Sequence, residues 1–183
     1  RTKSSAASDV YKRQGNMRYY GGYVLKTSNF AGYTPTPAYW RHTTRTNLPL
    51  GASTMDVYGA VGNAITIDGE DIYVAGYRDW FGDTGQEGPT GGYTPQYWKN
   101  GTLHDLEEGM RTEYGTGAAY DIKVTDGNVI VVGEVPRDTL DSYSIESACV
   151  WVNGELNHLV QIDDVNQNID DWMQSTAKGL YIE

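Results

Sequence analysis

The sequence predicts an all-β protein built from four-stranded antiparallel units. Three observations carry this prediction: the composition, a repeated pattern of alternating apolar residues, and glycine-containing dipeptides between the apolar runs. The chain of 183 residues holds 22 Gly and 15 Tyr but only 2 Phe, a composition that favours turns and half-buried strands over helices. No stretch of the sequence predicts a long helix.

The chain repeats itself about every 55 residues. The segment AITIDGEDIYVAGY (64–77) aligns with DIKVTDGNVIVVGEV (121–135) and with WMQSTAKGLYIE (172–183), and NMRYYGGY (16–23) matches the second half of this unit. Glycines and tryptophans recur at the same period, at Gly21, Gly76 and Gly133 and at Trp40, Trp98 and Trp151. Because every copy has a tryptophan at the same place, we expect these three side chains to fill the space between neighbouring units.

Each copy of the repeat reads as four short strands. In the second copy, Ile65 and Ile67 alternate with polar residues before Asp68-Gly69, and a second alternating run follows. The third strand ends near the tryptophan, and Asn-Gly follows it at Asn100-Gly101 and Asn153-Gly154. Asn-Gly predicts a type I′ hairpin turn, because both central residues need a positive φ. The first copy has YWRHTTRTNLPL at this place and lacks Asn-Gly.

Four antiparallel strands at this period are typical of a β-propeller blade, since kelch blades repeat at about 50 residues. We expect a β-propeller fragment of about three blade equivalents. Its expected parts are a partial blade at 15–50, two blades at 64–106 and 121–159, and a partial blade at 172–183. Closed propellers have about 4–8 blades, so the expected partners of the exposed blade faces are further blades of the same chain.

The units YVAGY and YWKNG resemble those of uncharacterised bacterial propeller-like repeat proteins. The resemblance covers residues 15–183. It implies a secreted or surface-anchored propeller with no assigned role, and therefore an extracytoplasmic location.

Residues 1–14 do not share the composition of the repeats. The segment SSAASDVYKRQ (4–14) resembles a translated transposase-type sequencing adapter. We therefore expect a non-native, disordered lead at 1–14 and exclude it from the fold. The alternative is a natural basic tail without order.

The charge argues against polyanionic partners. Four of the 14 basic and one of the 24 acidic residues lie in the lead, which leaves 10 and 23 in the rest of the chain. A surface this acidic repels phosphate, so nucleic acid and anionic membranes are not expected partners. No apolar stretch is long enough to predict a transmembrane helix. The single cysteine, Cys149, lies in an apolar run and is expected to be a buried small residue.

The long connections between strands are the expected binding face, because functional residues concentrate on such loops. The expected connections at 77–94, 107–119 and 134–147 combine aromatic and acidic side chains, which suit a carbohydrate or protein ligand. The candidate ligand-binding residues are Asp79, Trp80, Phe81, Tyr114 and Tyr143. The alternative is that Trp80 and Phe81 pin their own loop against the blade.

A weak calcium pattern lies in DDVNQNIDD (163–171). Oxygen-bearing residues alternate there at Asp164, Asn166, Asn168 and Asp170, as in a calcium loop. Ile169 stands where an EF-hand has glycine, and Ser175 stands where it has glutamate, so a solvated acidic loop is the alternative. No other cofactor is expected. His104 and His158 lie in equivalent fourth strands, one residue out of register, and a shared metal site between diverging outer strands is not expected.

These features favour a non-enzymatic propeller that binds a protein or a glycan at the cell surface. No catalytic motif stands in the sequence, and abundant carboxylates carry no meaning without geometry. The alternative is a part of a propeller-fold polysaccharide hydrolase or lyase, whose carboxylates come from several blades. A purely structural role remains as the third possibility.

Overall fold

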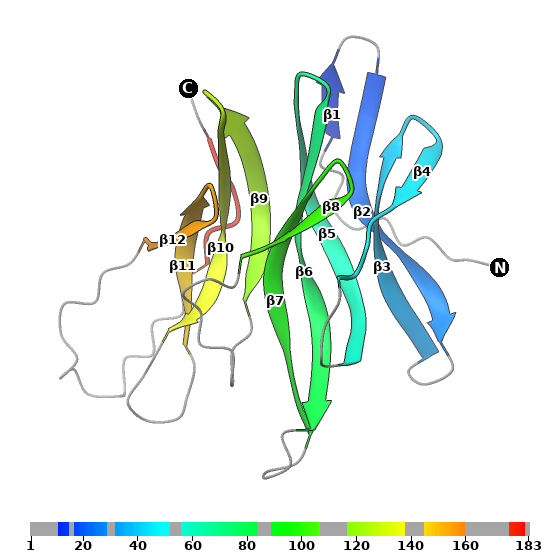
Figure 1. The fold of residues 1–183 in the computed structure, drawn as a ribbon, viewed down its shortest axis with the longest axis vertical. Helices are drawn as coiled ribbons and strands as arrows, with labels where there is room; N and C mark the ends of the chain where they lie inside the picture. Colours follow the sequence, from blue (N-terminus) through cyan, green and yellow to red (C-terminus); the bar gives the residue numbers. More distant parts are fainter. Residues whose placement is uncertain are drawn as a thin grey trace.

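A computed structural model describes residues 11–14, 17–28, 32–51, 56–83, 89–106, 117–137, 145–159 and 176–181. This part of the chain is all-β: it contains twelve strands and no helix. The strands form three four-stranded antiparallel sheets (Figure 1). None of the described residues belong to a helix that could cross a membrane.

The three sheets follow one another along the chain, and each contains four consecutive strands. Sheet I consists of β1 (Tyr11–Gln14), β2 (Met17–Ser28), β3 (Gly32–Arg41) and β4 (Thr44–Asn47). Sheet II consists of β5 (Asp56–Asp68), β6 (Asp71–Asp83), β7 (Pro89–Lys99) and β8 (Thr102–Asp105). Sheet III consists of β9 (Ala118–Thr125), β10 (Asn128–Arg137), β11 (Ile145–Val152) and β12 (Glu155–His158).

The pairing register shows that the three sheets are copies of one unit. Trp40 pairs with Tyr20, Trp98 with Val74, and Trp151 with Val131, so the tryptophans are equivalent, as the sequence predicts. The equivalent glycines are Gly22, Gly76 and Gly133. The expected equivalence of Gly21 is therefore wrong by one residue, because two adjacent glycines in the first copy leave the alignment ambiguous.

Two-residue turns join the first strand to the second in sheets II and III, and the third strand to the fourth in all three sheets. Both central residues have positive φ in Asn100-Gly101 (50° and 83°) and in Asn153-Gly154 (53° and 91°), which is the type I′ arrangement predicted for Asn-Gly. The β5–β6 turn is Gly69-Glu70 rather than Asp68-Gly69, because Asp68 pairs with Asp71 as the last residue of its strand. In sheet I the hairpin forms without Asn-Gly: His42 adopts a φ of 54°.

The side chain of the asparagine in each Asn-Gly turn also forms a hydrogen bond to the start of the second strand of its sheet. Asn100 Oδ1 accepts a hydrogen bond from the Ile72 amide (2.9 Å), and Asn100 Nδ2 donates to Asp71 Oδ1 (2.6 Å). Asn153 Oδ1 accepts from the Val129 amide in the same way (2.9 Å). The asparagine thus serves the left-handed turn and holds the start of the second strand.

We expect Asn100→Ala to destabilise the protein by about 1–2 kcal/mol. The left-handed conformation is unfavourable for alanine, and the variant loses the hydrogen bond to Ile72. Asn100→Gly keeps the backbone conformation and loses only the side-chain bonds, so it is expected to cost less. Urea unfolding of both variants measures the two contributions. Equal stability of the Ala and Gly variants would show that the left-handed conformation contributes nothing.

A β-bulge lies in the first strand of both sheet II and sheet III. Asn63 is the extra residue between the pairs Gly62–Gly76 and Ala64–Ala75. Tyr120 is the extra residue at the equivalent place, opposite Val132 and Gly133 of β10. A bulge redirects its side chain and bends the strand. Asn63 Nδ2 accordingly reaches the next sheet and donates to the Ala119 carbonyl (2.9 Å).

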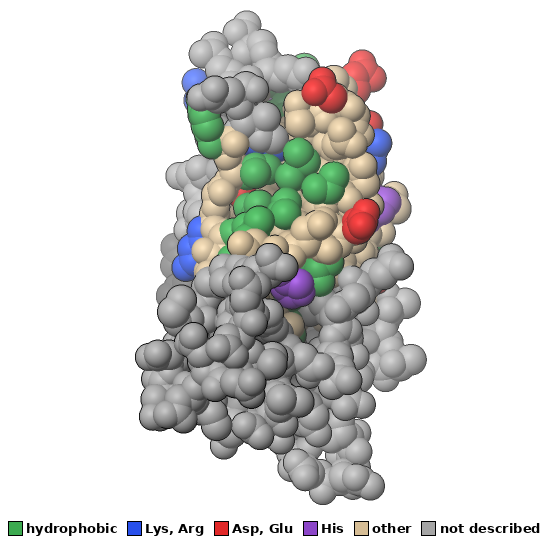
Figure 2. All heavy atoms as spheres, turned by 90° about the vertical axis from the view of Figure 1, so that its left-hand side faces the viewer, with side chains coloured by type: hydrophobic (Ala, Val, Ile, Leu, Met, Phe, Trp, Pro, Cys, Tyr) green, Lys and Arg blue, Asp and Glu red, His purple; other side chains and the backbone are tan. Residues whose placement is uncertain are grey.

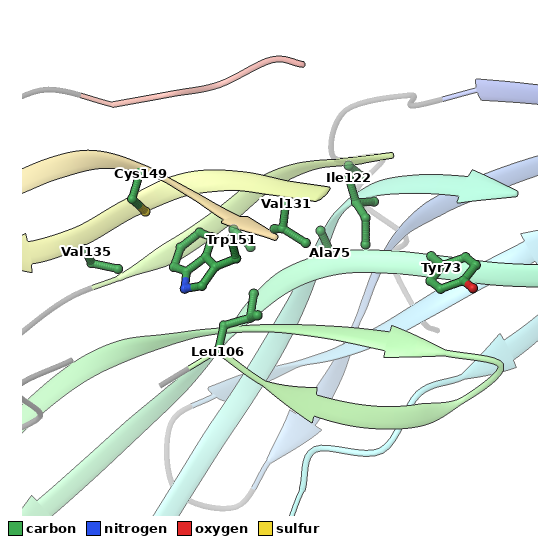
Figure 3. Close-up of a cluster of buried hydrophobic side chains, with 10 residues drawn as sticks. Tyr73, Ala75, Leu106, Ile122, Val131, Val135, Cys149 and Trp151 are labelled. Atoms are coloured by element: carbon green, nitrogen blue, oxygen red, sulfur yellow. The ribbon is translucent and has the colours of Figure 1, made fainter. Parts of the chain in front are cut away.

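The hydrophobic core lies between the sheets, in two separate clusters. Trp98 is 1% exposed and packs in a cluster with Tyr19 and Leu48 of the sheet I region, and its Nε1 donates to the Pro49 carbonyl (2.8 Å). Trp151 is fully buried and lies in the second cluster, with Leu106 pointing toward it from the end of sheet II (Figure 3). Trp98 and Trp151 therefore pack on the preceding sheet, as predicted, whereas Trp40 is only half-buried and has no preceding sheet among the described residues.

The structure differs from the expected bounds at the lead. Residues 11–14, expected to be disordered with the rest of the lead, form β1 and pair with Met17–Tyr20. They complete sheet I, expected as a partial blade, because the first edge of β2 offers free backbone groups to an extended segment. Residues 1–10 lie outside the described residues.

Candidate functional site

The strands extend into the segments expected to be loops. β6 continues to Asp83 and β7 begins at Pro89, so most of the expected 77–94 connection is a hairpin. Asp79, Trp80 and Phe81 are therefore strand residues, and the backbones of Trp80 and Phe81 pair with Gly92 and Gly91. Glycine and polar residues suggested a loop from sequence, but pairing on both sides of β6 overrides that weak preference.

Asp79 belongs to a small cluster of side chains, Tyr77, Asp79 and Tyr93, which we call the Tyr–Asp cluster. Tyr77 and Asp79 share one face of β6, and Asp79 pairs with Tyr93 of β7. The rings of Tyr77 and Tyr93 meet edge to face, with their centroids 4.8 Å apart. Tyr93 is 41% exposed, so the cluster presents an aromatic surface beside a carboxyl group at the end of the hairpin.

Partial burial sets the electrostatics of the Tyr–Asp cluster. Desolvation raises the pKa of Asp79 above its ordinary value. Desolvation also raises the pKa of Tyr77, and the neighbouring Tyr93 and Asp79 add to it. The Tyr77 phenol therefore stays a neutral hydrogen-bonding group, and desolvation disfavours the charged form of Asp79 in the folded protein.

Because its folded pKa is raised, Asp79 favours the fold most when it is protonated, and this contribution is lost as pH rises through its folded pKa. We expect Asp79→Asn to raise Tm relative to the parent at pH 7, and to raise it less at pH 3. Thermal unfolding at both pH values measures the difference. A Tm change that is independent of pH would contradict the inferred cost of the charge.

A second group of polar side chains lies on sheet III, where the bulge aims Tyr120. Tyr120 OH donates to Glu134 Oε1 (2.6 Å), and Thr176 Oγ1 donates to Glu134 Oε2 (2.5 Å). Burial and the hydrogen bond to Glu134 raise the pKa of Tyr120, and Tyr77 of the Tyr–Asp cluster adds to this shift. Both oxygens of Glu134 are thus engaged within the protein.

An open groove of about 680 Å³ lies between the outer strands of sheets II and III, apart from the expected binding residues. Tyr97 and His104 line it from sheet II, and Leu156 and His158 from sheet III. The rings of Tyr97 and His104 are stacked, with centroids 4.6 Å apart. His104 pairs with Tyr97 but His158 pairs with Cys149, and this offset places them on opposite faces of equivalent sheets, so both face the groove.

No group of three or more metal-binding side chains occurs among the described residues. The candidate calcium residues Asp164, Asn166, Asn168 and Asp170 lie outside the described residues, as do Tyr114 and Tyr143. Cys149 is fully buried, as predicted, and burial raises the pKa of its thiol. A neutral buried thiol is a poor nucleophile.

Sequence reasoning found Asp79 but missed its partners. Tyr77 lies two positions before Asp79 on β6, and Tyr93 lies two positions before Pro95 on β7. Strand alternation places each pair on one face of the strand, and this is the signal that the sequence offers for the two tyrosines. Tyr120 carries none, because a bulge shifts a strand's alternation and cannot be read from one sequence. His104 and His158 both line the groove. Their one-residue offset, together with strand alternation, could have predicted this from the sequence.

The chain matches no protein-family model, and no curated protein and no solved structure shows significant similarity to it.

Proposed function

We propose that this chain is a non-enzymatic binding module with β-propeller architecture, whose ligand is a glycan or a protein. The Tyr–Asp cluster carries the proposal. A half-exposed aromatic ring offers a flat apolar platform for a sugar ring or a side chain, and a nearby carboxyl group orients the hydroxyl or amide groups of the ligand. The repeated sheets supply a rigid scaffold for such a site.

The propeller architecture is supported by the way the sheets repeat. β5 packs against β2 and β3 of sheet I, and β9 packs against β5, β6 and β7 of sheet II. The first strands of sheets II and III thus lie against the preceding sheet, and the two interfaces use the same residue positions. Successive four-stranded antiparallel sheets in this relation are typical of propeller blades.

A glycan array and pull-down from a surface-protein extract test the binding role. We expect Tyr93→Ala to abolish binding of the ligand found and Asp79→Asn to weaken it. Tyr181→Ala is the matched control, because Tyr181 is an exposed tyrosine (81%) in the segment 176–181, away from the Tyr–Asp cluster. Retention of binding by Tyr93→Ala would remove the Tyr–Asp cluster from the site, and absence of any ligand would favour a structural role.

A polysaccharide hydrolase or lyase is the second candidate, and one observation favours it. Desolvation raises the pKa of Asp79, which is the direction that a general acid requires. Turnover of a polysaccharide that is lost in Asp79→Asn would establish this role. Binding without turnover, unchanged in kind in Asp79→Asn, would exclude it.

A further inference from the structure

Sheet III presents an apolar surface on the side that faces away from sheet II. In sheets I and II, this side packs against the sheet that follows. Figure 2 shows this side of the molecule, with a hydrophobic patch framed by polar atoms. On β10 and β11, Ile130 pairs with Val152 and Val132 with Val150, which places these four side chains on one face. Leu159 follows the last strand and is 53% exposed. We call Ile130, Val150, Val152 and Leu159 the sheet III end face.

The position that Leu159 occupies is an interface position in the other two sheets. Leu48, Leu106 and Leu159 occupy the same place, since each amide donates to the carbonyl at the matching position of the third strand (Pro37, Pro95 and Ala148). Leu48 and Leu106 are 4% and 1% exposed because each packs in the cluster of the next sheet's tryptophan. Leu159 lies at the same position, but among the described residues no tryptophan of a following sheet packs on it.

The opposite half of this interface lies at the other end of the same chain. Sheet II faces sheet I through Val74 and Trp98, and sheet III faces sheet II through Val131 and Trp151. The equivalent residues of sheet I are Tyr20 and Trp40, which have no preceding sheet in the described chain and are only half-buried. This surface therefore corresponds to the tryptophan side of the interface, which is the side that would contact Leu159. We call it the sheet I end face, and it consists of Arg18, Tyr20, Trp40 and Arg45.

Charge favours the same pairing. Arg18 and Arg45 are exposed on the sheet I end face. The equivalents of Arg18 in sheets II and III are the apolar residues Ile72 and Val129. Those of Arg45 are Leu103 and Leu156. The sheet III end face carries the exposed carboxylate of Glu155, which pairs with Val152. Asp121 and Lys123 lie on the same face, since they pair with Val132 and Ile130. Two acidic side chains and one lysine leave this face negative on balance, opposite in sign to the two arginines.

The segment 176–181 fits this arrangement. Ala177 N donates to the Gly133 carbonyl (3.3 Å), and Leu180 N donates to Asp121 Oδ2 (2.9 Å). In sheet I the equivalent carbonyl, that of Gly22, lies against Gly62 of the next sheet's first strand. The segment therefore occupies the place of a first strand. Among the described residues, β1 pairs with Met17–Tyr20 of β2, so in a head-to-tail arrangement of two copies the segment would lie opposite the rest of β2.

We propose that two copies of this chain associate head to tail, with the sheet III end face of one copy packed on the sheet I end face of the other. An interface between different surfaces closes into a ring when its rotation permits and otherwise extends into a fibre. Two copies supply six sheets, three each, which lies within the 4–8 blades of closed propellers. Closure at two copies rests on the proposed propeller architecture, whereas the pairing of the end faces does not.

Sedimentation velocity of the full chain tests the proposal across protein concentrations from low micromolar to several hundred micromolar. We expect a reversible dimer that is weakened by salt, because the arginine and glutamate charges are exposed. Leu159→Glu and Trp40→Glu are each expected to raise the dissociation constant about tenfold or more. Thermal unfolding checks that the variants remain folded, and Val152→Lys replaces Leu159→Glu if that variant does not.

Mixing the two variants gives the sharpest result. Leu159→Glu retains its sheet I end face and Trp40→Glu retains its sheet III end face, so an equimolar mixture is expected to regain a one-to-one dimer through one intact interface. A monomer at every concentration would overturn the proposal. A dimer that survives Trp40→Glu would overturn it in favour of a symmetric contact through sheet III, and long assemblies of the parent chain would overturn closure at two copies.

Discussion

Replacing Trp98 with alanine is expected to destabilise the protein by about 3–5 kcal/mol. The side chain is 1% exposed, lies between sheets I and II, and donates its Nε1–H to Pro49. Its removal leaves a cavity that two packed sheets cannot close, and an unpaired carbonyl. Because a domain of this size is stable by only about 5–15 kcal/mol, the variant is expected to lose a large part of its stability.

Trp40→Ala is the matched control for Trp98→Ala. Trp40 occupies the equivalent position in sheet I but is only half-buried. Its loss is expected to cost less than about 2 kcal/mol, measured by urea unfolding at a concentration below any self-association. Equal costs for Trp40 and Trp98 would show that the tryptophans contribute within their own sheets rather than between sheets.

Gly76→Ala is expected to have a comparable effect for a different reason. A Cβ on Gly76 would lie 1.8 Å from the Val61 carbonyl oxygen, and one on Gly133 would lie 2.0 Å from that of Ala118. Both contacts are with backbone at a bulge, so no side chain can move aside. The paired strands must separate, and we expect a loss of more than about 3 kcal/mol.

Gly179→Ala serves as the control for the glycine variants, because a Cβ there meets nothing within 4 Å. We expect its stability to lie within about 0.5 kcal/mol of the parent. Unfolding of Gly76→Ala, Gly133→Ala and Gly179→Ala in urea compares the three positions directly. A Gly76→Ala variant as stable as Gly179→Ala would be incompatible with the close approach at the bulge.

Strand order and turn positions could be predicted from the sequence because local chemistry determines them. Asn100-Gly101 and Asn153-Gly154 form the expected turns, the β5–β6 turn is shifted by one residue, and Trp98 and Trp151 pack between sheets as their recurrence indicates. The all-β class and the repeated four-stranded sheets are confirmed, whereas the propeller architecture stays a proposal. Strand ends were less predictable, because the last residues of β6 become strand through pairing with β5 and β7, which their own composition does not indicate.

The candidate site was only partly predictable. Asp79 was identified by its acidic and aromatic neighbours, but its setting depends on Tyr93, which belongs to another strand. Tyr120 is directed toward Glu134 by a bulge, and the adopted register of β9 cannot be derived from alternation alone. The order of Tyr11–Gln14 likewise arises from pairing with β2 and not from the segment's own composition.

Trp98 and Trp151 each stabilise the fold by packing on the end of the preceding sheet. A double-mutant cycle between Leu106→Ala and Trp151→Phe, measured by urea unfolding, tests this contribution most directly, with Leu159→Ala and Trp151→Phe as the control pair. The account predicts a coupling energy of about 1 kcal/mol for Leu106 with Trp151 and additive effects for the control. Additive effects for Leu106 and Trp151 as well would contradict the repeated interface on which the account rests.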